Sequence, residues 1–200
     1  MLHFYGSPMS SAGRTHLMLE ECGAPFEYHR VNLRDPAQKA EYLKVNPSGK
    51  IPFIVDGDVR MPESIAINFY LAEKYAPKLW AAQLEQRALI YAWSLWSIST
   101  LQHEVVRVMH HTFIVPQESR SAYEVETGKT NVQRYLDHLE TELPASGYLV
   151  DGRLTVADLN VASVVNLAAA MASGVLAPKT AAWLDGLKAR PAWKKVASSP

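Results

Sequence analysis

Strand-like and helix-like segments alternate over residues 1 to about 75, and beyond Ala76-Pro77-Lys78 the strand signals stop. Short apolar runs bounded by Gly, Pro, Asn and Ser clusters predict the strands, and apolar residues recurring at helical spacing predict the helices. The first part has the predicted order β-α-β-α-β-β-α, and the second part is predicted to be all helical. This pattern predicts an α+β fold with two domains, which we place at residues 1–76 and 82–200.

Local signals set the expected bounds of these elements. The first two strands are joined through a helix and are expected to be parallel, whereas Asp56-Gly57 joins the last two in a hairpin. Thr155-Val156-Ala157-Asp158 predicts a capping box at a helix start. The expected strands are 2–5, 26–33, 51–55 and 59–61, and the expected helices are 11–22, 36–45, 64–75, 83–112, 121–143, 156–172, 181–189 and 191–196.

Composition excludes several classes of function. Twenty basic and twenty acidic residues give a formal charge of zero, which argues against binding to nucleic acid or anionic lipid. The single cysteine, Cys22, excludes an intrachain disulfide and a thiolate zinc cluster. Polar residues interrupt the apolar stretch 159–176, so a buried helix is expected there and no membrane span. The N-terminus shows no secretory signal, and we expect a cytoplasmic protein.

Two segments of the first part carry candidate binding groups. Pro52 follows a turn and begins a strand, where proline cannot donate to a sheet; a cis Ile51-Pro52 bond would leave the Ile51 peptide exposed to an extended peptide ligand. Glu63-Ser64 stands at the predicted start of a helix, where N–H groups and the Ser64 hydroxyl can hold a carboxylate while Glu63 holds an ammonium group. A trans proline and a simple serine N-cap are the alternatives.

Hydroxyl groups also flank the first strand-to-helix turn. Tyr5 ends the strand, and Ser10-Ser11 precede the helix. A hydroxyl donor and the positive end of a helix can stabilise a thiolate, although a serine N-cap and a core tyrosine explain the same residues.

Histidines in the second part first suggest a metal site. His103, Arg107 and His110 share one face of the predicted helix, but the segment lacks the second histidine of a zinc-protease helix and Arg107 would repel a cation. We therefore predict a polar wall of an active site here and no metal.

Together and in order, these motifs resemble those of the cytosolic glutathione S-transferase family. The resemblance rests on Asn46-Pro47-Ser48-Gly49-Lys50-Ile51-Pro52, Glu63-Ser64-Ile65-Ala66-Ile67, Thr155-Val156-Ala157-Asp158 and Arg190-Pro191-Ala192-Trp193. It extends over essentially the whole chain and is similar to bacterial enzymes of the serine and cysteine types.

The resemblance implies a thioredoxin-like N-terminal domain, an all-α C-terminal domain and a homodimer. It implies glutathione as co-substrate, held by Lys50, by the backbone of Ile51 before Pro52, and by Glu63 and Ser64. The implied activity is transfer of the glutathione thiolate to a small hydrophobic electrophile, with no metal, nucleic-acid or membrane partner.

The catalytic hydroxyl is expected at Ser10, then Ser11, then Tyr5. The electrophile pocket is expected to include four residues of the helical domain: Trp96, His103, Val106 and His110. Two other functions remain open, namely a non-catalytic protein that binds a ligand or partner, and a glutathione-dependent isomerase or dehalogenase.

Overall fold

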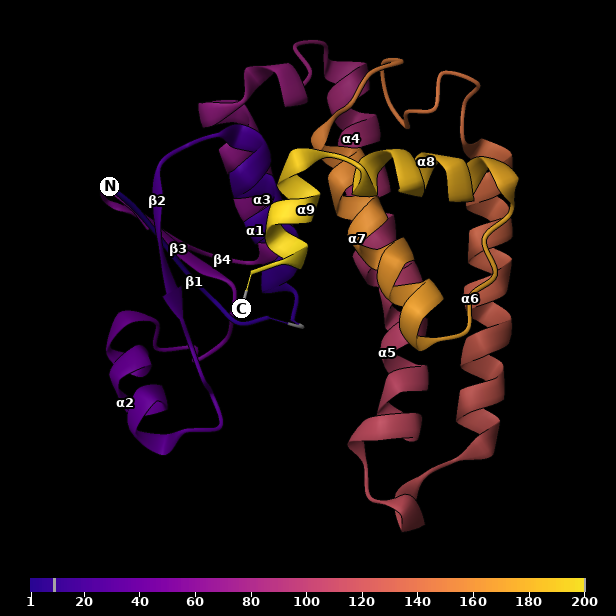
Figure 1. The fold of residues 1–200 in the computed structure, drawn as a ribbon, viewed down its shortest axis with the longest axis horizontal. Helices are drawn as coiled ribbons and strands as arrows, with labels where there is room; N and C mark the ends of the chain where they lie inside the picture. Colours follow the sequence, from indigo (N-terminus) through magenta and orange to yellow (C-terminus); the bar gives the residue numbers. More distant parts are fainter. Residues whose placement is uncertain (9, 200) are drawn as a thin grey trace. The chain divides into compact units, whose positions relative to one another are not determined.

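The computed structural model describes residues 1–8 and 10–199 of the chain. By their internal contacts, these residues form two units (Figure 1). Unit 1 consists of the described residues of Met1–Trp80 and Pro191–Pro200, and unit 2 is Ala81–Arg190. Among the described residues, no helix is both long enough and apolar enough to cross a membrane.

Unit 1 contains the predicted sheet and the helices that pack on it. Its four strands lie in the order β2-β1-β3-β4, with β1 parallel to β2 and antiparallel to β3, and β3 antiparallel to β4. The strand order along the chain and the hairpin are therefore as predicted. The elements are β1 (Leu2–Gly6), α1 (Ala12–Cys22), β2 (Phe26–Arg30), α2 (Pro36–Val45), β3 (Phe53–Asp56), β4 (Val59–Pro62), α3 (Ser64–Tyr75) and α9 (Pro191–Ala197).

The two faces of this sheet carry different side chains, because successive residues of a strand point to opposite faces. On one face, Phe4 is fully buried and packs against Tyr28 of β2 and His16 of α1, at ring-centroid distances of 5.0 and 5.8 Å. On the other face, Tyr5 packs against Tyr42 of α2 at 5.8 Å. Helix α1 thus covers one face, and α2 covers the other near Tyr5 (Figure 1).

Unit 2 is helical, as predicted, and is built around α7, most of whose residues are buried. The predicted capping box is present at its start: the Asp158 carboxylate accepts hydrogen bonds from the backbone N–H groups of Thr155 and Leu149, both at 2.9 Å, and from the Trp183 indole at 3.2 Å. The α-helices of unit 2 are α4 (Leu84–Trp96), α5 (Gln102–Met109), α6 (Ala122–Glu142), α7 (Val156–Met171) and α8 (Pro178–Lys188).

Several expected bounds differ by a few residues: β2 ends at 30 and not at 33, β3 begins at 53 and not at 51, and α8 begins at 178 and not at 181. Two differences go beyond such bounds. The predicted single helix over 83–112 is divided by the wider π-helical turns Ser97–Leu101 and His110–Ile114. The C-terminal residues, placed by the sequence in a domain spanning 82–200, join unit 1 instead, because α9 packs against α1 and Lys195 forms an ion pair with Glu20 at 2.7 Å.

Candidate active site

The end of the β3–β4 hairpin brings together the two binding segments expected from the sequence. The Ile51-Pro52 peptide bond is cis, as predicted. Phe53 pairs with Pro62 at the last position of the β3–β4 ladder. The next residues outward are Pro52 and Glu63, so the antiparallel register places the two segments opposite one another.

A buried amide fixes the turn that leads into this peptide. The side chain of Asn46 donates to the carbonyl of Lys50 at 2.8 Å, and the Tyr42 hydroxyl donates to the same carbonyl at 2.6 Å. Burial raises the pKa of Tyr42, which keeps its hydroxyl protonated and able to donate. Lys50 itself is exposed. Asn46 belongs to the motif that carries the family resemblance but was not among the expected site residues; its position directly after a helix and before Pro47 is the signal of a turn residue.

Glu63 and Ser64 have different environments at the start of α3. Glu63 is exposed and has a φ angle of 70°, a conformation that residues with a side chain rarely adopt. Ser64 is the first helical residue, is buried, and does not serve as the N-cap. No side-chain cap hydrogen bond is made at this end of α3 in the described chain. The alternative of a simple serine cap is therefore wrong here.

The two serines before α1 also differ. The Ser10 hydroxyl donates to the Ser7 carbonyl at 2.7 Å and accepts from the Ala12 N–H at 3.1 Å, so both of its functions are taken up in the local turn. The Ser11 hydroxyl instead donates to the Ile51 carbonyl at 3.3 Å, a long hydrogen bond to the peptide beside Pro52. Ser11, which the sequence ranked second, is thus the serine that the fold places against the binding segment.

Neither Tyr5 nor Cys22 lies in such a position. Tyr5 is on β1, where its ring stacks on His29 at 4.5 Å, on the sheet face that α2 partly covers. Cys22 ends α1, and burial, together with the charge of Glu21, raises the pKa of its thiol to about 12. A thiol with that pKa stays protonated at neutral pH and is a poor nucleophile.

The four residues expected to contact the electrophile do not all share one surface of unit 2. His103, Val106 and His110 are exposed, at positions that share one side of a helix. The Trp96 ring packs instead against Trp93 and against His138 of α6, at 5.3 and 6.1 Å. The π-helical turn between Trp96 and α5 changes the angular relation that regular helical spacing would give.

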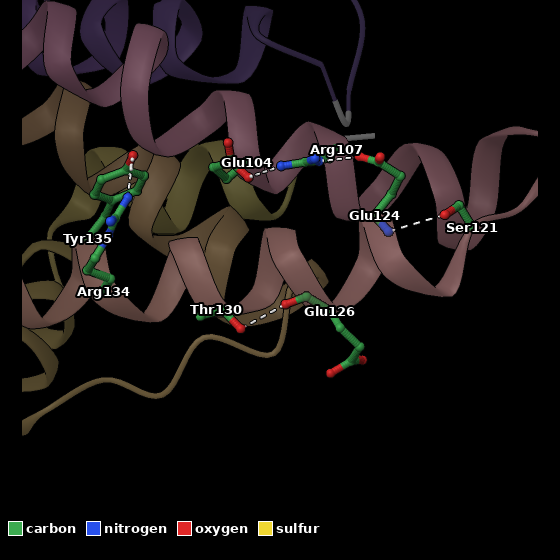
Figure 2. A network of polar contacts seen from close by, with 8 residues as sticks. All are labelled: Glu104, Arg107, Ser121, Glu124, Glu126, Thr130, Arg134 and Tyr135. Atoms are coloured by element: carbon green, nitrogen blue, oxygen red, sulfur yellow. Dashed lines mark hydrogen bonds and ion pairs between the residues drawn. The ribbon is translucent and has the colours of Figure 1, made fainter.

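Arg107, which lies between these histidines in the sequence, is held toward α6. Figure 2 shows its guanidinium between the carboxylates of Glu104 and Glu124. The hydrogen bond from Arg107 lowers the pKa of Glu124, and the same bond raises the pKa of Arg107. The positive charge is therefore paired within unit 2.

Comparisons with known proteins agree with this arrangement. Residues 8–74 match the family model for the glutathione S-transferase N-terminal domain, and residues 106–191 match that for the C-terminal domain. Glutathione S-transferase F13 of Arabidopsis thaliana is 32% identical, over 98% of this chain and 94% of the relative. Glutathione S-transferase 4 of Zea mays is 30% identical, over 96% and 90%. The chain belongs to the glutathione S-transferase family.

Solved structures give the same result for the fold. A glutathione S-transferase I bound with lactoylglutathione has a TM-score of 0.85 and 30% identity, and the match covers 98% of each chain. A theta-class glutathione S-transferase of Xanthomonas axonopodis pv. citri, with glutathione bound, has a TM-score of 0.85 and 26% identity, covering 100% of this chain and 98% of that one. The predicted family and the thioredoxin-like domain followed by a helical domain are confirmed.

Proposed function

We propose that this member of the glutathione S-transferase family binds glutathione at the end of the β3–β4 hairpin and activates its thiol for attack on a small hydrophobic electrophile. The observation that carries the proposal is the meeting of three elements at one end of the unit 1 sheet. The Ile51 peptide lies opposite Glu63 and Ser64 in the strand register, and the Ser11 hydroxyl contacts the Ile51 carbonyl.

The chemistry of these groups matches glutathione. The backbone of Ile51 can pair with the cysteinyl part of an extended peptide. Ser64 and the uncapped start of α3 suit the α-carboxylate of the γ-glutamyl residue, since a helix N-terminus attracts anions. The exposed Glu63 carboxylate suits its ammonium group, and Lys50 offers a second cationic contact.

For catalysis, we assign the activation of the glutathione thiol to Ser11 rather than to Ser10. The hydroxyl of Ser10 already donates one hydrogen bond and accepts another within its own turn. The hydroxyl of Ser11 donates only one long hydrogen bond, to the Ile51 carbonyl, among the described residues. In the complex, Ser11 donates to the glutathione sulfur and stabilises the thiolate, whose proton passes to solvent. The sulfur then forms a bond to an electrophilic carbon. In a substitution the leaving group departs with its electron pair; in an addition the π bond of the acceptor breaks and the neighbouring carbon takes a proton from solvent.

The electrophile, the assembly and the location complete the proposal. His103 and Val106 of α5, and His110 of the turn that follows it, provide exposed side chains for contact with the electrophile. The protein forms a homodimer through an apolar stripe on α4, whose residues Leu84, Tyr91 and Leu95 are 67%, 41% and 51% exposed. The proposed location of the protein is the cytoplasm.

Alanine substitution at the two serines tests the catalytic assignment. We expect Ser11→Ala to lower kcat with an aromatic electrophile by about 10- to 100-fold, because each unit of thiol pKa changes the thiolate fraction tenfold near neutral pH. The KM for glutathione should change little, and Ser11→Thr should retain activity. We expect Ser10→Ala to lose a turn hydrogen bond and about 1 kcal/mol of stability while keeping kcat.

Calorimetry with reduced glutathione separates binding from turnover. Saturable binding together with turnover supports the proposal. Binding without turnover of any electrophile would favour the non-catalytic alternative, and full activity in the Ser11→Ala variant would remove Ser11 from its role.

A further inference from the structure

Three potential metal ligands converge on the sheet face opposite α1. They are His3 of β1 and Glu27 and His29 of β2, and one ligand atom from each lies within 4.8 Å of the others. The parallel register explains the convergence: His3 pairs with Glu27, and His29 is two residues farther along β2 on the same face.

The distances within this group match those of a metal site. His3 Nδ1 lies 3.0 Å from His29 Nε2 and 3.3 Å from Glu27 Oε2, and His29 Nε2 lies 3.5 Å from Glu27 Oε1. Ligands at the usual Zn–N and Zn–O lengths in a tetrahedral site are about 3.4 Å apart. The three separations join four atoms, since Glu27 presents one oxygen to each histidine, and all three are close to the spacing expected between ligands of one ion.

Protons satisfy only part of this arrangement. If both imidazole nitrogens carried a proton, two N–H groups would meet head-on at 3.0 Å. If only one did, the two rings would share an N–H···N hydrogen bond at 3.0 Å, and the accepting nitrogen would have no proton for the Glu27 carboxylate oxygen beside it. A single cation placed among the three groups attracts all three sets of lone pairs at once.

The surroundings favour an open, accessible site. The side chains of His3, Glu27 and His29 are 35%, 56% and 33% exposed. The Tyr5 ring stacks on His29 at 4.5 Å and limits its rotation. His29 also borders a groove of about 560 Å³ between the sheet and α2, which leaves space for small molecules beside the ring.

We propose that His3, Glu27 and His29 bind a divalent transition-metal ion, with Zn²⁺ as the fitting ion, leaving at least one coordination position to water or a small ligand. Two imidazoles and one carboxylate select transition metals over Mg²⁺ and Ca²⁺, which take oxygen ligands. Three protein ligands with an open position are typical of reactive zinc sites rather than of closed structural ones. The amino-acid pattern does not reveal this group, because His3 is 24 residues from Glu27 and 26 from His29 and meets them only through strand pairing.

Titration of the metal-free protein, made without a histidine tag, with ZnCl₂ in a calorimeter tests the site. We expect one ion per chain and no response to Mg²⁺. His3→Gln, Glu27→Gln and His29→Gln should each weaken binding by about tenfold or more, since each removes one of three ligands. The matched controls His138→Gln, an exposed histidine on α6, and Glu41→Gln, a carboxylate beside the same groove, should bind as the wild type does.

Zinc X-ray absorption of the loaded wild-type protein gives a second measurement that does not depend on the variants folding. We expect two imidazole ligands and oxygen donors at the remaining positions. The proposal is overturned by the absence of saturable binding, by wild-type affinity in the His3→Gln and His29→Gln variants, or by a spectrum without two imidazoles. None of these outcomes bears on glutathione binding, which uses other residues.

Discussion

Glu63 holds a backbone conformation that costs free energy, with a φ angle of 70° at the junction of β4 and α3. Such conformations typically cost on the order of 1–3 kcal/mol outside glycine and are concentrated at ligand sites. Here the strain directs an exposed carboxylate toward the place proposed for the γ-glutamyl ammonium group. Function and stability are thus expected to oppose one another at this residue.

Replacing Glu63 by glycine and by alanine separates the two effects. Both variants lose the carboxylate, so we expect both to bind glutathione about tenfold more weakly. Glycine relieves the strain, so Glu63→Gly should be about 1 kcal/mol more stable than Glu63→Ala, as measured by urea unfolding. Equal stability of the two variants would contradict the strain, and unchanged affinity would contradict the role of the carboxylate.

Asp56 is a second residue with a measurable effect, at the end of β3. Its Oδ2 atom accepts hydrogen bonds from the Tyr70 and Tyr75 hydroxyls, both at 2.7 Å, and from Lys74 Nζ at 2.8 Å. Burial acts to raise the pKa of Asp56, but hydrogen bonds from Lys74, Tyr75 and Tyr70 outweigh it and hold the pKa below its ordinary value. The ionised carboxylate therefore ties β3 to α3.

This lowered pKa predicts how stability depends on pH. A carboxyl whose pKa is lower in the folded state stabilises that state above its unfolded pKa, and the contribution is lost as pH falls through the folded pKa. We expect Asp56→Asn to lose about 1–2 kcal/mol at pH 7. The difference from wild type should shrink below about pH 4. Asp58→Asn, at an exposed position in the same hairpin, is the control; a difference that grew in acid would refute the linkage.

The parts of the fold that the sequence predicted are those with local signals. The β3–β4 hairpin follows from Asp56-Gly57 and the capping box from Thr155 and Asp158, because each depends on residues a few positions apart. The two proposed binding segments were predicted for the same reason. The choice between Ser10 and Ser11 was not available from the sequence, since it depends on a contact with Ile51, 40 residues away.

At the scale of elements, hydroxyl side chains accompany the irregular helix over 84–114. Ser97 donates to the Ser94 carbonyl at 2.7 Å, and Thr112 donates to the Val108 carbonyl at 2.7 Å. Such bonds compete for carbonyls that a regular helix uses and often bend it. Apolar periodicity alone could not place these turns, because the apolar positions continue through them.

The packing of α5 against α6 depends on a glycine. A Cβ atom on Gly128 of α6 would lie 2.7 Å from Val108 Cγ2 and 3.3 Å from the Glu104 backbone oxygen. Val108 is a stiff, buried side chain and the other neighbour is backbone, so neither can move easily. Gly186 of α8 is also within a helix, but its Cβ would meet nothing within 4 Å.

The two glycines form a matched pair of variants. We expect Gly128→Ala to destabilise the protein by about 1–2 kcal/mol, because overpacking exceeds the gain in helix propensity. Gly186→Ala should stabilise it by about 0.5–1 kcal/mol, since only the propensity changes. Urea unfolding measures both, and a Gly128→Ala variant as stable as Gly186→Ala would show that α5 and α6 are not closely packed.

At the scale of the whole molecule, the chain order does not coincide with the units. Helix α9 is the last helix of the chain but packs on α1, where Lys195 forms an ion pair with Glu20. The other carboxylate oxygen of Glu20 lies 3.6 Å from His16 Nε2. The sequence showed α9 as a helix but carried no local signal of its partner. A ligand group formed by strand pairing, such as His3, Glu27 and His29, escapes sequence analysis for the same reason.

The proposed dimer predicts a change of mass for a single substitution. Leu84, Tyr91 and Leu95 are exposed apolar side chains spaced along one side of α4, and a second copy would bury them. We expect the wild type to sediment at about twice the chain mass and Leu95→Glu to sediment as a monomer, because a carboxylate would be buried in an apolar contact. Val175→Glu, at a side chain 70% exposed outside α4, should remain dimeric. A wild type that is monomeric at micromolar concentration, or a dimeric Leu95→Glu variant, would rule out this surface as the interface.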